Sequence, residues 1–354
     1  MRTRWSAAAL AIAAVLTGWA QGQEASKATL LALSKQDHTL AIIDPVSLKI
    51  LATEPVGDDP HEVIASADGR TAYVSNYGFG AFHTLAVIDL VGRKPLQFID
   101  LGPLRGPHGL AFVDGKVWFT AEAAKAIGSY DPAAAKVDWI MGTGQNRTHM
   151  IYVFPGAKRI LTTNVNSATV TILDHTEGRA GMPPGPPPGI GQQPGGPPFG
   201  PPPGPPGGDW METVIPVGRG SEGFDVSPDG REAWVANAGD GTVSVIDLGS
   251  KSVTATLAVN VPGANRLKFT PDGKLALVTA GSALVVLDTA TRKEVKRLTG
   301  VHGSGGIQMQ PDGARAYVAC GRDGYVAVID LRTLELVGKV QIASPDGLAW
   351  AVRE

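Results

Sequence analysis

Residues 227–259 read SPDGREAWVANAGDGTVSVIDLGSKSVTATLAV, and this stretch contains the pattern that decides the fold. An Asp-Gly pair is followed by three short runs in which apolar residues alternate with polar or small ones. Alternation with a period of two indicates β-strands, and Asp-Gly between two such runs indicates a tight hairpin because glycine accepts a positive φ. Together with the preceding run EGFDVS (222–227), the stretch predicts a unit of four short antiparallel strands.

The same unit recurs along the chain. Phrases of the type VID end at Asp44, Asp89, Asp131, Asp174, Asp247, Asp288 and Asp330. Successive spacings are 41 to 45 residues, except for 73 between the fourth and fifth phrases. Turn signals such as SADG, SPDG, TPDG and QPDG run in step with them. We expect each Asp of either kind to cap its turn. Seven units of about 42 residues with four strands each are typical of β-propeller blades.

The two ends of the chain predict how the ring closes. The first unit lacks an equivalent of the first strand, whereas the C-terminal DGLAWAV (346–352) matches HGLAFV (108–113). We therefore expect an all-β protein with a single seven-bladed propeller over residues 24–354. Its blade one is completed by the C-terminal strand, which removes the free edge that an open β-solenoid would expose.

These motifs resemble those of a known family. Residues 227–259, with YVSN (73–76) and YVAC (317–320), resemble the YVTN family of β-propeller repeats found in exported and surface proteins of bacteria and archaea. The resemblance covers the whole mature chain and implies the fold, while such propellers serve many roles. The unit GPHGLAFVDGKVWFTAEAAKAIGSYDP (106–132) also resembles streptogramin-lyase repeats, a pattern that occurs in one blade only.

The N-terminus predicts export. Arg2 and Arg4 precede the apolar run SAAALAIAAVL (6–16), and small residues follow it. This arrangement is typical of a signal peptide over residues 1–20, so we expect a periplasmic or extracellular protein without a membrane span in the mature chain. The single cysteine, Cys320, lies in an alternating run and is expected in the core, which excludes an intramolecular disulfide.

The long interval contains a proline-rich segment. Residues 178–208 include MPPGPPPGIGQQPGGPPFGPPPGPPGG, which has no charge and few large apolar side chains. Such a composition predicts a disordered or polyproline-II loop, inserted between the third and fourth strands of blade four. It could bind a partner or the cell envelope, or it could be an insertion without a role.

One column of residues carries the candidate site. Alignment of the turns places seven residues at the start of the innermost strands, in blade order Asp346, His61, His108, His149, Glu222, Asn265 and Gly305. Loops between second and third strands add polar residues to the same channel mouth, among them Asn76, Tyr77, Glu122, Asn164, Asn237 and Arg322, while Arg147, Arg266 and His302 lie next to the column. We predict a binding mouth made of His61, His108, His149, Glu222, Asp346, Asn76 and Arg266.

The three histidines allow two interpretations. They could converge on one divalent metal ion, with Glu222 or Asp346 as a further ligand or base, or they could line a hydrated channel. A metal ion is the one cofactor that the residues suggest. Catalytic motifs such as G-x-S-x-G, the P-loop and H-E-x-x-H are absent from the sequence.

The composition and motifs together favour a binding protein. The net charge is −2, which argues against nucleic-acid binding. We expect a monomeric binding or scaffolding propeller whose channel mouth holds a small molecule, a peptide or a protein. The alternatives are a metal-dependent hydrolase or lyase of the lactonase kind that uses His61, His108 and His149, and a surface module that acts through the proline-rich loop.

Overall fold

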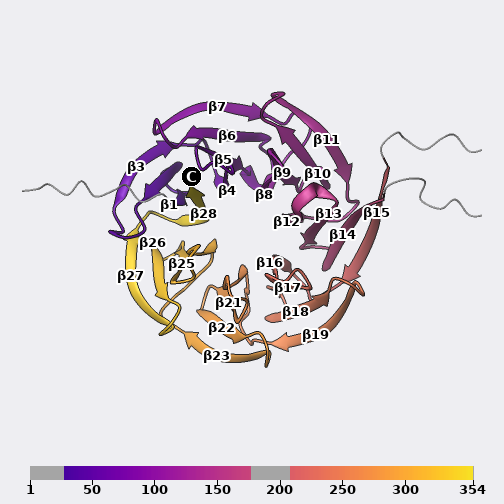
Figure 1. The fold of residues 1–354 in the computed structure, drawn as a ribbon, viewed down its shortest axis with the longest axis vertical. Coiled ribbons are helices and arrows are strands. Elements are labelled where there is room, and N and C mark those ends of the chain that lie inside the picture. Colours follow the sequence, from indigo (N-terminus) through magenta and orange to yellow (C-terminus); the bar gives the residue numbers. More distant parts are fainter. Residues whose placement is uncertain (1–27, 177–207, 354) are drawn as a thin grey trace, which may run out of the picture.

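The computed structural model describes residues 28–176 and 208–353, and these form a ring of seven four-stranded antiparallel sheets (Figure 1). The predicted seven-bladed all-β propeller is therefore confirmed. The predicted signal peptide and nearly all of the proline-rich segment lie outside the described residues.

Each blade runs from an innermost strand to an outermost one. The strands of blades one to three are β28 (Pro345–Val352), β1 (Ala28–Ser34), β2 (Thr39–Ile43) and β3 (Ile50–Pro55); β4 (Pro60–Ala65), β5 (Thr71–Asn76), β6 (Thr84–Asp89) and β7 (Lys94–Asp100); and β8 (Pro107–Val113), β9 (Lys116–Ala121), β10 (Ala126–Asp131) and β11 (Lys136–Gly142).

The remaining four blades follow the same order. Their strands are β12 (Thr148–Val153), β13 (Arg159–Asn164), β14 (Thr169–Thr176) and β15 (Asp209–Pro216); β16 (Ser221–Val226), β17 (Glu232–Asn237), β18 (Thr242–Asp247) and β19 (Ser252–Ala258); β20 (Leu267–Phe269), β21 (Leu275–Ala280), β22 (Ala283–Asp288) and β23 (Lys293–Leu298); and β24 (Ile307–Met309), β25 (Arg315–Cys320), β26 (Tyr325–Asp330) and β27 (Glu335–Gln341).

The C-terminal strand closes the ring as predicted. β28 pairs antiparallel with β1, with Ala28 opposite Val352, and becomes the inner strand of blade one. The position of the proline-rich segment is also as predicted, because it joins β14 to β15, the third and fourth strands of blade four.

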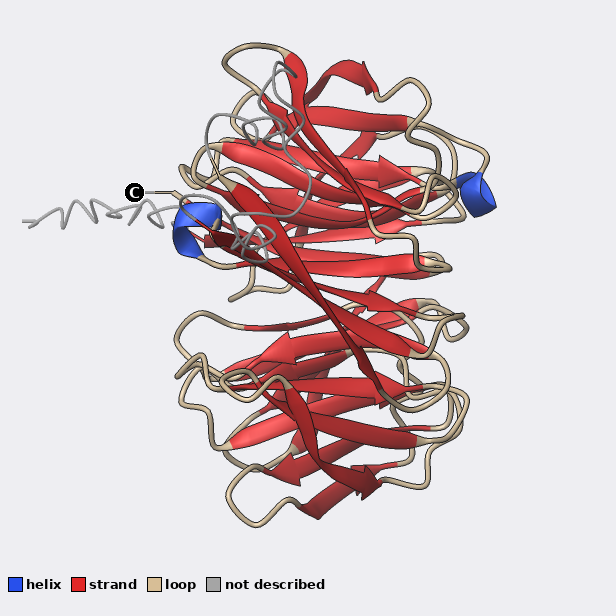
Figure 2. Ribbon diagram, turned by 90° about the vertical axis from the view of Figure 1, so that its right-hand side faces the viewer, coloured by secondary structure: helices blue, strands red, loops and turns tan. Residues whose placement is uncertain are grey.

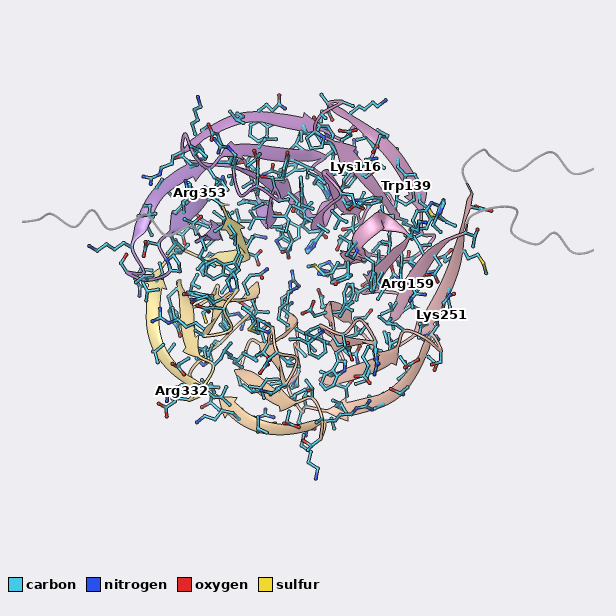
Figure 3. All side chains as sticks on the ribbon, in the orientation of Figure 1. Lys116, Trp139, Arg159, Lys251, Arg332 and Arg353 are labelled. Carbon is cyan, nitrogen blue, oxygen red and sulfur yellow. The ribbon has the colours of Figure 1, made fainter. Side chains whose placement is uncertain are left out.

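The core lies between the blades. An apolar cluster fills each of the seven junctions, and in the junction of blades five and six the ring of Trp234 meets that of Phe269 at 5.4 Å. Trp139, on the outermost strand of blade three, lies near the outer rim of the ring (Figure 3). Cys320 is fully buried in one of these clusters, as expected.

Most of the aspartates that recur in the repeated units cap turns. Asp44 accepts hydrogen bonds from the backbone N–H groups of Val46 and Ser47, and Asp68 accepts one from the N–H of Arg70. Asp174 is an exception, because the segment after it continues into the long β14–β15 arm. Its carboxylate instead contacts Arg159 and Lys251, each at 2.6 Å.

The two faces of the ring differ. The helical turns η1 (Gly78–Gly80) and η2 (Pro155–Ala157) project from opposite sides (Figure 2). η1 belongs to a loop between second and third strands, so its side is the channel mouth; η2 joins a first strand to a second. No helix among the described residues is long and apolar enough to cross a bilayer.

Candidate metal and ligand site

The predicted column is present at the channel mouth. His61, His108, His149, Glu222 and Asp346 are each the second residue of an inner strand. In blades six and seven the inner strands have only three residues, and the column positions Asn265 and Gly305 precede them.

A hydroxyl in the second strand holds the column in place. The Thr120 hydroxyl accepts from the N–H of Gly109 at 2.9 Å and donates to the carbonyl of His149 in the next blade at 2.7 Å. Ser75 and Thr163 make the same bridge in blades two and four. These bridges fix the backbones of neighbouring column residues, so the orientation of their side chains is set by the framework of the blades.

The three histidine rings lie together. The ring centroids of His61 and His108 are 4.2 Å apart, and those of His108 and His149 are 3.8 Å apart. His108 is 0 % exposed, and neither of its ring nitrogens has a hydrogen-bond partner among the described residues. Burial, together with the positive charges of the other two histidines, Arg266 and Arg147, holds the pKa of His108 well below its usual value. This imidazole is therefore neutral at pH 7.

His149 has the opposite electrostatic environment. Its Nδ1 hydrogen-bonds to Glu122, and its Nε2 lies 2.7 Å from Glu222, an ion-pair contact without hydrogen-bond alignment. Burial disfavours the charged ring, but the two carboxylates outweigh burial and raise the pKa of His149. Burial likewise opposes ionisation of Glu222, yet His149 and Arg147 lower its pKa to about 2. The Tyr77 hydroxyl donates to the second oxygen of Glu122 at 2.5 Å.

His61 faces a carboxylate and an ammonium group. Its Nδ1 lies 2.7 Å from Oδ2 of Asp346 and 2.6 Å from Nζ of Lys35, which also pairs with Asp59 at 2.8 Å. One nitrogen cannot donate to the carboxylate and accept from the ammonium at the same time, so either tautomer satisfies one contact only. Burial opposes ionisation of Asp346, but His61 and Lys35 outweigh it and lower its pKa.

An ion pair crosses the channel beside the histidines. Arg266 of blade six donates to Glu62 of blade two at 2.6 Å, and both side chains are largely buried. Nε of Arg266 is a buried donor without a partner among the described residues. The pair borders a channel cavity of about 120 Å³ whose apolar lining includes Leu110, Met150, Phe224, Leu267, Ile307 and Leu348.

The structure brings together most, but not all, of the predicted mouth. Asn76 is buried in the wall, where its amide donates to the carbonyls of Val56 and Asp58, so the group is used to hold the loop. Lys35 and Glu62 contact the predicted residues and were not singled out from the sequence. Glu62 did have a signal, because it follows the column residue at a position that is glycine in four of the seven blades.

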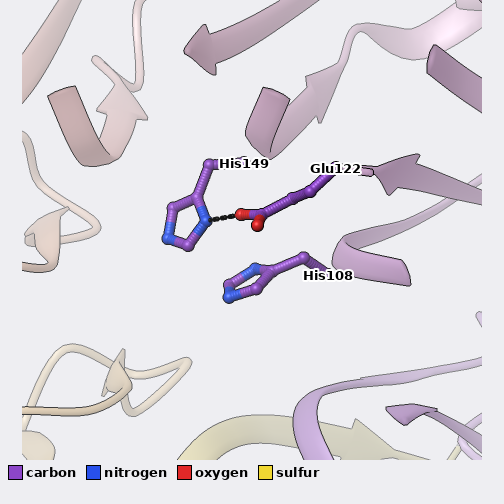
Figure 4. A group of neighbouring side chains, drawn as sticks. All are labelled: His108, Glu122 and His149. Carbon is purple, nitrogen blue, oxygen red and sulfur yellow. Dashed lines mark hydrogen bonds and ion pairs between the residues drawn. The ribbon is translucent and has the colours of Figure 1, made fainter. Parts of the chain in front are cut away.

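One group among the described residues could hold a metal ion. His108, Glu122 and His149 offer ligand atoms that all lie within 4.8 Å of one another, and all three side chains are buried (Figure 4). Two imidazoles and a carboxylate are ligands suited to zinc and related transition metals. The predicted trio was His61, His108 and His149, so Glu122 takes the place of His61 in the tightest group.

Comparison with known proteins supports the fold alone. The sequence matches no protein-family model, and no curated protein matches it. A functionally unknown protein from Desulfotomaculum acetoxidans superposes with a TM-score of 0.71 at 14% identity, covering 92% of this chain and 99% of the other. A proposed 6-phosphogluconolactonase from Bacteroides uniformis superposes with a TM-score of 0.68 at 13% identity, covering 91% of this chain and 99% of the other. Hydrazine synthase from Kuenenia stuttgartiensis superposes with a TM-score of 0.66 at 16% identity, covering 85% of this chain and 92% of the other.

Proposed function

We propose that this protein is a binding propeller whose channel mouth holds a divalent transition-metal ion, and through it a small ligand. The observation that carries the proposal is the burial of both ring nitrogens of His108 without hydrogen-bond partners among the described residues. Two buried ring nitrogens without partners cost free energy, since a buried unsatisfied polar group destabilises a fold by about 1–3 kcal/mol. A metal ion bound by His108, Glu122 and His149 would give one of these two nitrogens a partner.

The charge balance of the mouth supports a cation. Its interacting carboxylates are Asp59, Glu62, Glu122, Glu222 and Asp346, and its permanent cations are Lys35, Arg147 and Arg266. With neutral imidazoles this network has two uncompensated negative charges, which one divalent ion would neutralise. The carboxylates raise the pKa of His149, and a metal ion bound to this ring would displace any proton that they favour.

The hydrogen bonds around the histidines support the same assignment. Metal-binding histidines usually donate their second ring nitrogen to a carboxylate, which fixes the tautomer. Asp346 lies in this position beside Nδ1 of His61, so His61 could join the site through Nε2. Glu222, which is ionised because of its low pKa, could complete the ligand set.

Two further parts of the proposal come from the sequence. The repeats are proposed to be YVTN repeats, and the protein is proposed to act in the periplasm or outside the cell after removal of residues 1–20. A mature N-terminus near Gln21 or Gln23 in mass spectrometry supports export, and an intact Met1 refutes it.

Metal analysis tests the central proposal. We expect purified protein, treated with EDTA and reloaded with zinc, to hold about one equivalent after gel filtration. His108→Ala should lose this zinc. His83→Ala is the matched control, because His83 also meets a carboxylate, Asp100, but its side chain is partly exposed and lies outside the group formed by His108, Glu122 and His149. The proposal is wrong if the parent holds no zinc, or if His108→Ala holds as much as the parent.

Metal-assisted hydrolysis of a lactone or ester is the second candidate. Arg147 favours it, because its half-buried guanidinium spans Glu122 and Glu222 above His149 and could donate to a carbonyl oxygen. A bound metal ion would supply Lewis-acid activation of such a carbonyl. The likeness to the proposed lactonase adds the substrate class. A panel of lactones with zinc-loaded parent and Arg147→Gln tests this candidate, which fails if no lactone is opened above the zinc-free rate.

A further inference from the structure

The loop after β5 is longer than its counterparts. It spans residues 77–83, whereas the loops between second and third strands elsewhere have two to four residues: 35–38, 122–125, 165–168, 238–241, 281–282 and 321–324. The extra residues bring Phe79 to the tip, where its side chain is 90 % exposed. These loops lie on the face of the ring that holds the proposed metal site, and the loop after β5 is the longest of them.

Hydrogen bonds tie this loop to the neighbouring segments. The N–H of Gly78 donates to Oδ2 of Asp59 at 2.9 Å, and the N–H of Gly106 in the next blade donates to the carbonyl of Phe82 at 2.8 Å. Phe79 itself has φ 50° and ψ 37°, the left-handed region that L-residues adopt at a cost. The ring is thus held in solvent by a fixed backbone, which reduces the entropy lost when a ligand packs on it.

An aromatic series leads from Phe79 to the histidines. The Phe79 and Tyr77 rings are 6.1 Å apart, and Tyr77 stacks on His61 at 5.2 Å with an interplanar angle of 16°. Tyr77 also meets His108 edge-on at 5.2 Å. These separations limit the distance from the Phe79 ring to the His108 ring to about 11 Å, so one small molecule could contact both the metal site and Phe79.

We propose that Phe79 is a specificity-determining residue that selects ligands with a planar apolar group next to a metal-binding oxygen donor. This inference rests on the proposed metal site and deepens it. A small ligand is the occupant because the apolar side chains that this loop exposes are Phe79 and part of Phe82, whereas a stable protein interface needs about 800 Å² from each partner. The donor would enter the mouth, and the planar group would stack on Phe79 at the rim.

Two hydroxamates serve as probes. Acetohydroxamate and benzohydroxamate share the metal-binding group and differ in the ring. We expect Phe79→Ala to weaken benzohydroxamate binding to the zinc-loaded protein by roughly three- to tenfold, since an aromatic pair contributes a modest stabilisation. Acetohydroxamate affinity should not change. Phe79→Tyr, which keeps the ring, should restore benzohydroxamate binding. Titration calorimetry measures all of these affinities.

The controls separate the two proposals. Phe98→Ala removes another exposed ring, on the outer strand β7, and should alter neither affinity. Zinc content is measured on every sample. Absence of zinc from the parent refutes the metal site itself, and with it the role of Phe79. Zinc bound normally with no loss of benzohydroxamate affinity in Phe79→Ala overturns only the role of Phe79. An equal loss for both probes, or a change of oligomeric state in gel filtration, also overturns it.

Discussion

Replacing His108 by leucine should change stability in opposite directions with and without metal. Leucine is similar in size to histidine and has no polar atom, so it can fill the site between His61 and His149. The low pKa of His108 means that no charge is lost at pH 7. Because both buried ring nitrogens lack partners, we expect His108→Leu to raise the free energy of unfolding in EDTA by about 1–3 kcal/mol.

Zinc should reverse this order. A ligand that binds only the folded state stabilises it by about 4.1 kcal/mol when its free concentration is 1,000 times its dissociation constant. The parent would gain this amount, and the His108→Leu variant would gain none, since one of its metal ligands is missing. At high zinc the parent should therefore equal or exceed the variant in stability, whereas in EDTA it is the weaker of the two.

Denaturant unfolding at pH 7, followed by tryptophan fluorescence, measures both effects. The fully buried Trp234 is a suitable reporter, because unfolding exposes it. His83→Leu is the control and should match the parent in both conditions. The reasoning is refuted if His108→Leu is destabilised in EDTA, which would mean that the imidazole has polar partners without metal. Equal stabilisation of both proteins by zinc would remove His108 from the metal site.

Three further predictions concern the network around the site. Glu62→Gln should lower the free energy of unfolding by about 3–5 kcal/mol, because it leaves Arg266 charged and buried. The double variant Glu62→Leu/Arg266→Met should recover most of that loss in denaturant unfolding, and additive losses would contradict this. The pKa of Glu222 is lowered from 4.5 to about 2, so its ionised form should add about 3 kcal/mol to the free energy of unfolding above pH 4.5. This contribution should disappear as the pH falls toward 2, and Glu222→Gln should flatten this part of the curve of stability against pH. Thr120→Val should lower the free energy of unfolding by about 1–3 kcal/mol, because it leaves two backbone groups unpaired between blades three and four. An unchanged free energy of unfolding would show that the hydroxyl bridge is dispensable.

The fold was predictable because the same local rules repeat. Asp-Gly turns and alternating strands define each unit, and a repeated unit leaves little freedom in the arrangement. The match between DGLAWAV and HGLAFV identified the closing strand, and the same alignment placed His61, His108 and His149 at one mouth. Two inner strands were shorter than expected, since VPGAN and GSGG do not favour extended pairing before β20 and β24.

The partners of the histidines were harder to predict. Glu122 was expected near the mouth, but whether its carboxylate turns toward His149 depends on the conformation of its loop. Lys35 lies in a loop with no repeated polar position. The pairing of Glu62 with Arg266 joins residues 204 positions apart across the ring, and repeats specify neighbours rather than such a diagonal contact. Asn76 belongs to the repeated framework, so its polarity reflects loop capping.

The pairing of β28 with β1 also has a consequence for the order of synthesis. β1 emerges from the ribosome among the first segments of the propeller, and its partner is nearly the last. Until residues 345–352 are made, the backbone donors and acceptors along one side of β1 have no strand to pair with, and such an edge can recruit strands from other chains. Blade one is therefore completed last, whereas each of blades two to seven consists of four consecutive strands. A chain that ends before β28 keeps an unpaired edge on β1, which favours aggregation or proteolysis, so the closed ring requires the C-terminal strand.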